Sequence, residues 1–138
     1  MEMEGIPRRV AIAATGLACS MFGPFDHLLR TLIVFMAIDA ITGISAAVTQ
    51  KLSGKAEAVG LSSSAGLGGL IKKGMCLLVI VVGVHLDMLL DTGSLARDAI
   101  IIAFIISELI SIVENMGKMG IKLPPIISSA VELLNKKA

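Results

Sequence analysis

Three acidic residues lie inside long apolar stretches of this sequence, where an ionised carboxylate is energetically costly. They are Asp39, Asp87 and Glu108. A carboxylate at the centre of a bilayer costs about 3 kcal/mol or more. Such acids either form hydrogen bonds between helices and hold a bundle together, or line a water-filled path. The two interpretations are compatible, because a polar seam between packed helices can become a pore wall after a rearrangement.

The residue types give little support for enzymatic chemistry. No nucleophile lies beside a general base, and no Cys or His has a partner at metal-ligand spacing. We interpret Cys19 and Cys76 as small hydrophobic residues. Phosphate-binding motifs are missing, and no basic patch alternates with aromatic residues as in nucleic-acid-binding proteins. We predict a protein that is not an enzyme, with no catalytic residue, cofactor, metal or nucleic-acid partner.

The composition indicates a membrane protein. Of the 138 residues, 55% are hydrophobic and 17% are charged, against about 45–50% and about 25% in soluble domains. The apolar segments leave no room for a separate soluble core. We therefore expect one membrane domain over residues 1–138.

The apolar residues fall into four segments, 10–22, 28–48, 74–90 and 99–113. A helix over 28–48 would be about 30 Å long, which matches the hydrocarbon core of a bilayer. Segment 10–22 is short for a span, so it crosses a thinned bilayer, re-enters, or lies at the interface. A cleaved signal peptide is the less favoured interpretation. We expect a cytoplasmic loop over 49–73 and a tail over 114–138, in which 126–137 form an amphipathic helix.

The predicted fold is an all-α membrane protein with three to four transmembrane helices, plus a short C-terminal cytoplasmic amphipathic helix. Lys and Arg positions set the orientation. With four crossings, which we favour, Arg30 and Arg97 lie on one side and the other ten of the 12 basic residues lie on the opposite side. Both termini are then cytoplasmic. The residues expected to anchor the helices at the interface are Lys51, Lys55, Lys72, Lys73, Lys118 and Lys122.

Small and polar residues share one face of each long apolar segment, since helix offsets of 3, 4, 7 and 11 return to the same side. Ala103, Ser107 and Ser111 also form a ridge of small residues that lets membrane helices approach closely. Three to four helices are too few to enclose a wide aqueous path. Any pore must therefore be formed by several copies of the chain. The candidate pore or helix-packing residues are Asp39, Thr42, Gly43, Ala46, Gly83, Asp87, Ser107, Glu108, Ser111, Glu114 and Asn115.

Four segments together resemble a known family. They are FMAIDAITGISAAV (35–48), GLIKKG (69–74), VGVHLDMLLDTG (82–93) and ISELISIVENMGKMGIKLPP (106–125). In their order and spacing they resemble the bacteriophage holins of the toxin-secretion/phage-lysis family. Asp39, Thr42 and Gly43 match the ID-x-x-TG motif, and Asp87 matches the Asp of a later span. The last element is matched by Glu108, Ser111, Glu114 and Asn115.

The resemblance implies a few transmembrane helices and no enzymatic activity. Proteins of this family accumulate in the host's cytoplasmic membrane and oligomerise at a set time. The resulting lesions let an endolysin reach the cell wall, and some members serve toxin secretion. The implied partners are the lipid bilayer, further copies of the chain and, as a candidate, an antiholin. The endolysin is cargo that needs no direct contact.

Two other functions fit the same residues. A small oligomeric ion channel or transporter would use the polar faces without causing lysis. An antiholin-type regulator would delay lysis by another protein and be harmless alone.

Overall fold

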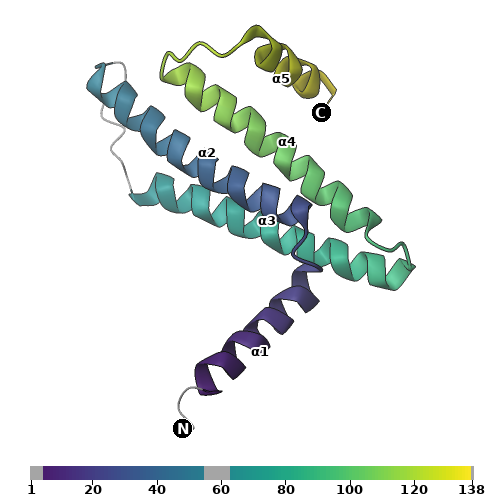
Figure 1. The fold of residues 1–138 in the computed structure, drawn as a ribbon. Coiled ribbons are helices and arrows are strands. Elements are labelled where there is room, and N and C mark those ends of the chain that lie inside the picture. Colours follow the sequence, from purple (N-terminus) through teal and green to yellow (C-terminus); the bar gives the residue numbers. More distant parts are fainter. Residues whose placement is uncertain (1–4, 55–62, 138) are drawn as a thin grey trace.

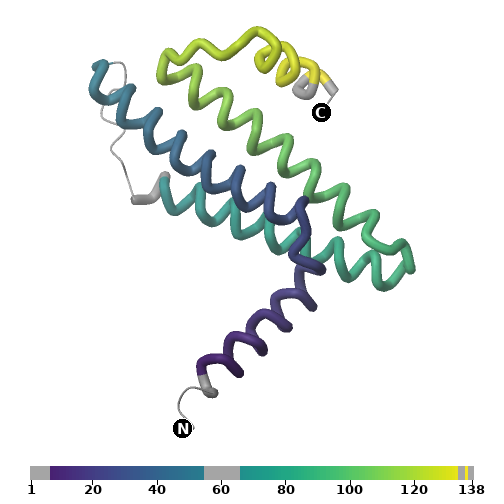
Figure 2. Tube along the Cα trace, in the orientation of Figure 1, coloured from purple at the N-terminus to yellow at the C-terminus, as the bar shows by residue number. Residues whose placement is uncertain are grey.

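The computed structural model describes residues 5–54 and 63–137, and within these ranges the chain is helical apart from short turns (Figures 1 and 2). Three long helices form the bundle, one helix precedes it, and one short helix follows it. The elements are α1 (Gly5–Phe22), α2 (His27–Leu52), α3 (Ser63–Leu90), α4 (Leu95–Lys118) and α5 (Pro125–Lys137).

Helices α2 and α4 run in the same direction, and α3 runs antiparallel to both (Figure 1). One end of the bundle holds the turn before α2 and the turn between α3 and α4; we call it the turn end. The opposite end, where α2 and α4 finish and α3 begins, is the tail end. Helix α1 projects away from the bundle, whereas α5 folds back towards α4.

Capping and turn residues fix the ends of these helices. The Asp26 side chain accepts a hydrogen bond from the Leu29 amide at 3.0 Å and caps α2. Gly23 separates α1 from α2 with a φ of +75°, which glycine adopts without strain. Pro124 precedes α5 and Pro125 is its first residue, where a proline's missing amide hydrogen costs nothing.

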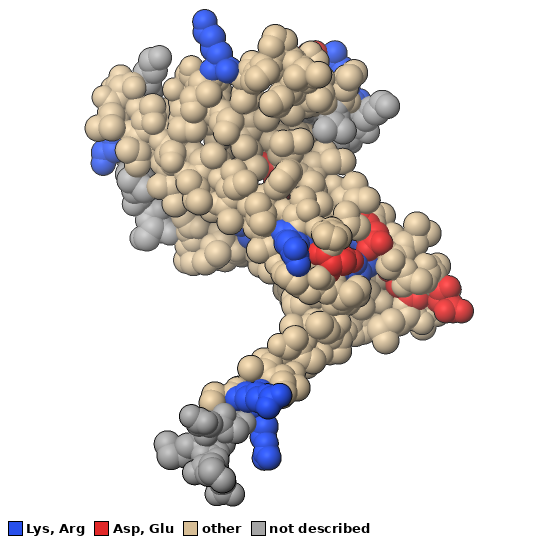
Figure 3. All heavy atoms as spheres, viewed as in Figure 1, with Lys and Arg blue, Asp and Glu red and all other residues tan. Residues whose placement is uncertain are grey.

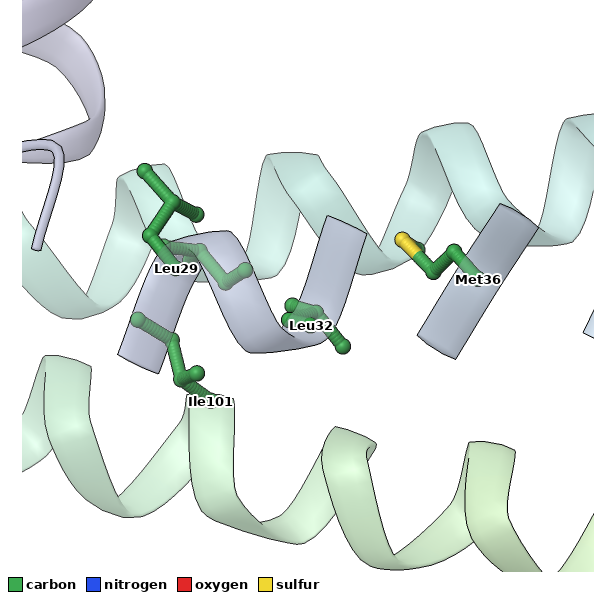
Figure 4. Close-up of a cluster of buried hydrophobic side chains, with 5 residues drawn as sticks. Leu29, Leu32, Met36 and Ile101 are labelled. Atoms are coloured by element: carbon green, nitrogen blue, oxygen red, sulfur yellow. The ribbon is translucent and has the colours of Figure 1, made fainter. Parts of the chain in front are cut away.

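A small apolar core joins the three long helices near the turn end. It contains Leu29, Leu32, Met36, Ile80 and Ile101, of which Leu32, Ile80 and Ile101 are fully buried. Figure 4 shows the α2 members beside Ile101 of α4. Many outward-facing residues of the bundle are large and apolar, including Ile41 of α2 and Val82 of α3. Such a surface suits a lipid environment and not water.

Helices α2, α3 and α4 are each long and apolar enough to cross a membrane, and they are the three such helices in the described part of the chain. The all-α membrane fold is thereby confirmed, with three helices of spanning length and a short C-terminal helix. Helix α1 does not meet the same test, so the favoured fourth crossing stays a prediction.

The helices extend beyond the predicted apolar segments. Helix α3 begins at Ser63, so Lys72 and Lys73 lie inside it and not in a loop. Helix α4 includes Glu114 and Asn115, which were expected in the tail. Hydropathy ends a segment at its first charge, but helical backbone hydrogen bonds continue past it, and here Lys73 is also paired with acids of the neighbouring helices. Lys55 lies outside the described residues.

Candidate functional site

An ion-paired lysine lies between two of the acids that the sequence places in apolar segments. The Lys73 Nζ atom of α3 donates to Asp39 Oδ2 of α2 at 3.0 Å and to Glu108 Oε2 of α4 at 2.5 Å. The exposed fractions of these three side chains are 19%, 17% and 12%. One ammonium group therefore connects all three long helices.

A buried amide completes this arrangement. The Asn115 Nδ2 group of α4 donates to Asp39 Oδ1 at 3.1 Å and to Thr42 Oγ1 at 3.4 Å. The Thr42 hydroxyl donates to the Asp39 carbonyl at 3.1 Å. A Cβ atom added at Gly43 would lie 3.5 Å from Asn115 Nδ2, an ordinary van der Waals distance, so Gly43 packs beside the amide without excluding a larger residue. We call Asp39, Thr42, Lys73, Glu108 and Asn115 the central cluster.

The charges of the central cluster do not balance. With both acids ionised, its two carboxylates and one ammonium group sum to −1. In a membrane such charges interact strongly, because the low dielectric screens them little. Removing Lys73 would leave two carboxylates of like charge facing each other across the bundle. Lys73 therefore separates the two carboxylates and joins the three long helices.

A second ionic cluster lies at the turn end. The whole residue Arg97 of α4 is 2% exposed. Its guanidinium donates to Asp26 Oδ2 at 2.7 Å, to Asp98 Oδ1 at 2.8 Å, and to the carbonyls of Phe22 and Pro24, each at 2.8 Å. Arg97 thereby ties the turn before α2 to the first turn of α4. These five residues are the turn-end cluster.

Asp87 lies next to the turn-end cluster and caps α4. Its carboxylate accepts hydrogen bonds from the Thr92 hydroxyl at 2.5 Å and from the amides of Ala96 and Arg97, both at 2.8 Å. Negative charge at a helix N-terminus is stabilising, because the free amides and the helix dipole both favour it. Asp87, an acid in an apolar segment of α3, is thus paired with the first backbone amides of α4.

Close packing of α3 on α4 depends on Gly83. A Cβ atom there would lie 2.7 Å from Ile100 Cδ1 and 3.2 Å from the Arg97 Cα. Only glycine allows the backbones to approach this closely.

The Arg97 guanidinium also lowers the pKa of Asp26, which lies in the turn before α2. Its hydrogen bond to the Asp26 carboxylate is the main cause that lowers the pKa of Asp26 below its ordinary value of 3.8. Figure 3 shows acidic side chains gathered on this part of the molecule, with basic side chains at the tail end and on α1.

The structure brings some of the predicted residues together and separates others. Asp39, Thr42, Gly43, Glu108 and Asn115 meet in one place, and Ala46 is buried on the same face of α2. Gly83 and Asp87 contact the start of α4 instead. The remaining candidates face away from the bundle or lie at its edge: Ser107 and Glu114 are exposed, and Ser111 is half-buried.

Sequence reasoning missed two cations that form ion pairs between parts of the bundle. Lys73 was assigned to the membrane interface and Arg97 to an external turn. A signal existed for Lys73, because its partners Asp39 and Glu108 are carboxylates in apolar segments, where a cation from a neighbouring helix stabilises them. Asp26 and Asp98, the partners of Arg97, lie outside those segments and gave no such signal. Of the other predicted interfacial residues, Lys51, Lys118 and Lys122 are exposed near the tail end.

Both clusters join helices or turns through charged hydrogen bonds, which is a structural role. In the described residues no group of His, Cys, Asp and Glu side chains is arranged to hold a metal ion. A cavity of about 450 Å³ lies between α1 and the bundle, lined by apolar residues such as Ala18, Phe22 and Leu77. None of the central-cluster residues lines it.

Comparison with known proteins gives one family. A family model described as the bacteriophage holin family matches residues 16–136. An uncharacterized protein of Clostridium perfringens is 37% identical over 118 residues, covering 85% of this chain and 82% of the relative. An uncharacterized protein of Listeria monocytogenes is 33% identical over 118 residues, covering 86% and 79%.

A relative whose name states a function comes from a bacterial virus. A protein of Bacillus phage phi105 named "Probable holin" is 27% identical over 114 residues, covering 83% of this chain and 78% of the relative. No solved structure matches the chain.

Proposed function

We propose that this chain, which belongs to the bacteriophage holin family, oligomerises in the cytoplasmic membrane of a host bacterium and opens lesions in it. The family consists of pore-forming membrane proteins, and the chain is not an enzyme. The lesions let an endolysin pass to the cell wall or, in the alternative that the family resemblance also allows, release a toxin.

The observation that carries this proposal is the central cluster. It places two carboxylates, an ammonium group and an amide inside three helices of spanning length. In the closed bundle these groups satisfy one another. When copies assemble and the helices separate, water replaces the lost partners, so the groups that closed the bundle line the lesion.

The membrane potential is the proposed trigger. Moving one elementary charge across 100 mV is worth about 2.3 kcal/mol. The central cluster carries such charges at membrane depth, on three helices that can move relative to one another. Collapse of the potential therefore changes the balance between the closed bundle and the assembled lesion.

The proposed orientation puts both termini and the segment between α2 and α3 in the cytoplasm. The Lys and Arg bias supports this, because ten of the 12 basic residues fall on that side if α1 also crosses. The basic side chains near the tail end agree with a cytoplasmic position of that end.

The test is expression in a bacterium, with and without an endolysin. A holin causes an abrupt loss of potential and leakage, and lysis when endolysin is present. A channel or transporter without lytic activity gives neither, and an antiholin delays lysis caused by another holin. Absence of leakage and lysis at normal membrane levels would overturn the proposal.

Two variants test the role of the cluster. Asp39→Ala and Glu108→Ala each remove one partner of Lys73, and we expect both to shift the onset of lysis. Asp91→Asn is the control, because Asp91 is an exposed acid in the turn after α3 and asparagine tolerates its φ of +53°. Unchanged timing and extent of lysis in both cluster variants would remove the central cluster from the mechanism.

A further inference from the structure

Helices α3 and α4 meet at the turn end but lie farther apart towards the tail end (Figure 1). Near the turn end, Gly83 of α3 lies against Ile100 of α4. Lys72 precedes Gly83 by 11 residues, and therefore lies on the same stripe of α3. Ser107 and Ser111 follow Ile100 by 7 and 11 residues, and lie on the same stripe of α4. Two stripes that pack together at one end are thus uncovered at the other.

The uncovered stripes carry polar groups that have no partner within residues 5–54 and 63–137. Lys72, Ser107 and Glu114 are exposed and Ser111 is half-buried. Among the described residues, neither Lys72 nor Glu114 forms an ion pair, and neither serine hydroxyl donates a hydrogen bond. The hydroxyls of Thr31, Ser45 and Thr49 on α2, by contrast, donate to carbonyls four residues back.

Unpaired polar groups on the outer surface of a membrane helix favour a protein partner over lipid. We infer that this outer α3–α4 face binds a second copy of the chain, with α4 packed against α4 around a two-fold axis along the membrane normal. The inference rests on the proposed function and specifies the surface through which the holin assembles.

Charge complementarity supports this partner. Two copies inserted in the same direction present the same residues at the same depth. Glu114 lies six residues beyond Glu108, about 9 Å nearer the tail end. Lys72 directly precedes Lys73, which contacts Glu108, and its long side chain can extend towards the tail end. Glu114 of one copy can therefore pair with Lys72 of the other.

Small residues let the two helices approach. Ala103 is exposed on α4 one turn before Ser107. The face opposes alanine and serine side chains to their own copies, so hydroxyl hydrogen bonds can form between helices.

Disulfide crosslinking in bacterial membranes tests the interface. In a background with Cys19→Ala and Cys76→Ala, single variants Ser107→Cys and Ser111→Cys are oxidised, and the dimer fraction is measured. The controls Ile102→Cys on α4 and Ile41→Cys on α2 introduce cysteine at other exposed apolar positions. We expect several-fold more dimer from positions 107 and 111 than from the controls. Equal dimer fractions at all four positions would overturn the inference.

A charge exchange sharpens the test. Glu114→Lys and Lys72→Glu, each combined with Ser107→Cys, should lower the dimer fraction about twofold or more, as expected of a partly exposed ion pair. The double exchange should restore it, and failure to restore it would overturn the Lys72–Glu114 pairing.

Leakage measured in the same cells separates the two proposals. Leakage without preferential crosslinking contradicts this interface alone, whereas crosslinking without leakage contradicts the proposed function alone.

Discussion

The two ionic clusters of this molecule connect its helices in different ways. In the turn-end cluster, Arg97 is 2% exposed and its donors are matched by two carboxylates and two backbone carbonyls. In the central cluster, Lys73 is 19% exposed and serves two carboxylates from two other helices. The first cluster joins two neighbouring turns, and the second spans the bundle.

The difference separates a permanent joint from a contact that can be exchanged. A rigid guanidinium with four fixed acceptors cannot be replaced by water without several simultaneous losses. A lysine ammonium is a compact charge on a flexible stem, and water can solvate it and its partners once the helices part. We infer that the turn end stays folded while the central cluster opens.

Arg97→Ala should have the largest effect on stability. It leaves Asp26, Asp98 and two carbonyls without their donor, and breaking such a buried pair costs about 3–5 kcal/mol. Thermal unfolding of the detergent-solubilised protein measures the loss. Arg8→Ala is the control, since Arg8 is exposed on α1. If both variants melted alike, the turn-end cluster would not be a joint.

Lys73→Met should have the next largest effect, about 3 kcal/mol, because Lys73 serves two carboxylates, whereas Arg97 serves two carboxylates and two backbone carbonyls. The two remaining carboxylates repel each other across the bundle, so we expect earlier lysis as well as weaker folding. Lys72→Met, at the adjacent exposed position, should change stability far less. Adding Asp39→Asn and Glu108→Gln to Lys73→Met should recover most of the stability, and no recovery would refute the charge imbalance as the cause.

Gly83→Ala should cost about 1–2 kcal/mol, because its Cβ atom would lie 3.2 Å and 3.3 Å from the Arg97 backbone Cα and N atoms, which cannot rotate away. Gly74→Ala is the matched control in the same helix, with no atom within 4 Å of the new Cβ. Alanine favours a helix by up to about 1 kcal/mol over glycine, so Gly74→Ala should stabilise the protein. The same melting experiment compares them, and equal effects of the two substitutions would argue against close packing at Gly83.

The smallest effect concerns pH. The lowered pKa of Asp26 means that its contribution to stability is present above its ordinary pKa of 3.8 and is lost as the pH falls through the lower folded value. The melting temperatures of the wild type and of Asp26→Asn should therefore differ by a constant amount at pH 5–7 and converge below about pH 4. A difference that persists unchanged at pH 2 would contradict the Asp26–Arg97 pairing.

The stripes of small and polar residues were readable from the sequence because helix periodicity alone defines them. The face of α2 that carries Asp39, Thr42 and Ala46 does turn towards α4, with Thr42 and Ala46 buried. The short C-terminal helix was also predictable, since the Pro124–Pro125 pair is typical of a helix start.

The partners of the acids were not readable in the same way. Lys73 lies 34 residues from Asp39 and 35 from Glu108, and which cation reaches which carboxylate depends on how the helices pack. Arg97 is 71 residues from Asp26 and pairs with it only because two turns meet at one end of the bundle. The stripe of α4 was also too wide to assign, because Glu108 and Asn115 face inwards while Ser107 and Glu114 face outwards.

The most direct test of the account is the water accessibility of the central cluster before and during lysis. In a cysteine-free background, Thr42→Cys introduces a thiol at a buried position, and Ile41→Cys places one on the neighbouring exposed apolar surface. A membrane-impermeant thiol reagent is added before and after leakage begins. We expect position 42 to be protected before leakage and labelled during it, with position 41 unlabelled throughout. Protection of position 42 after leakage has begun, or labelling before it, would contradict the account.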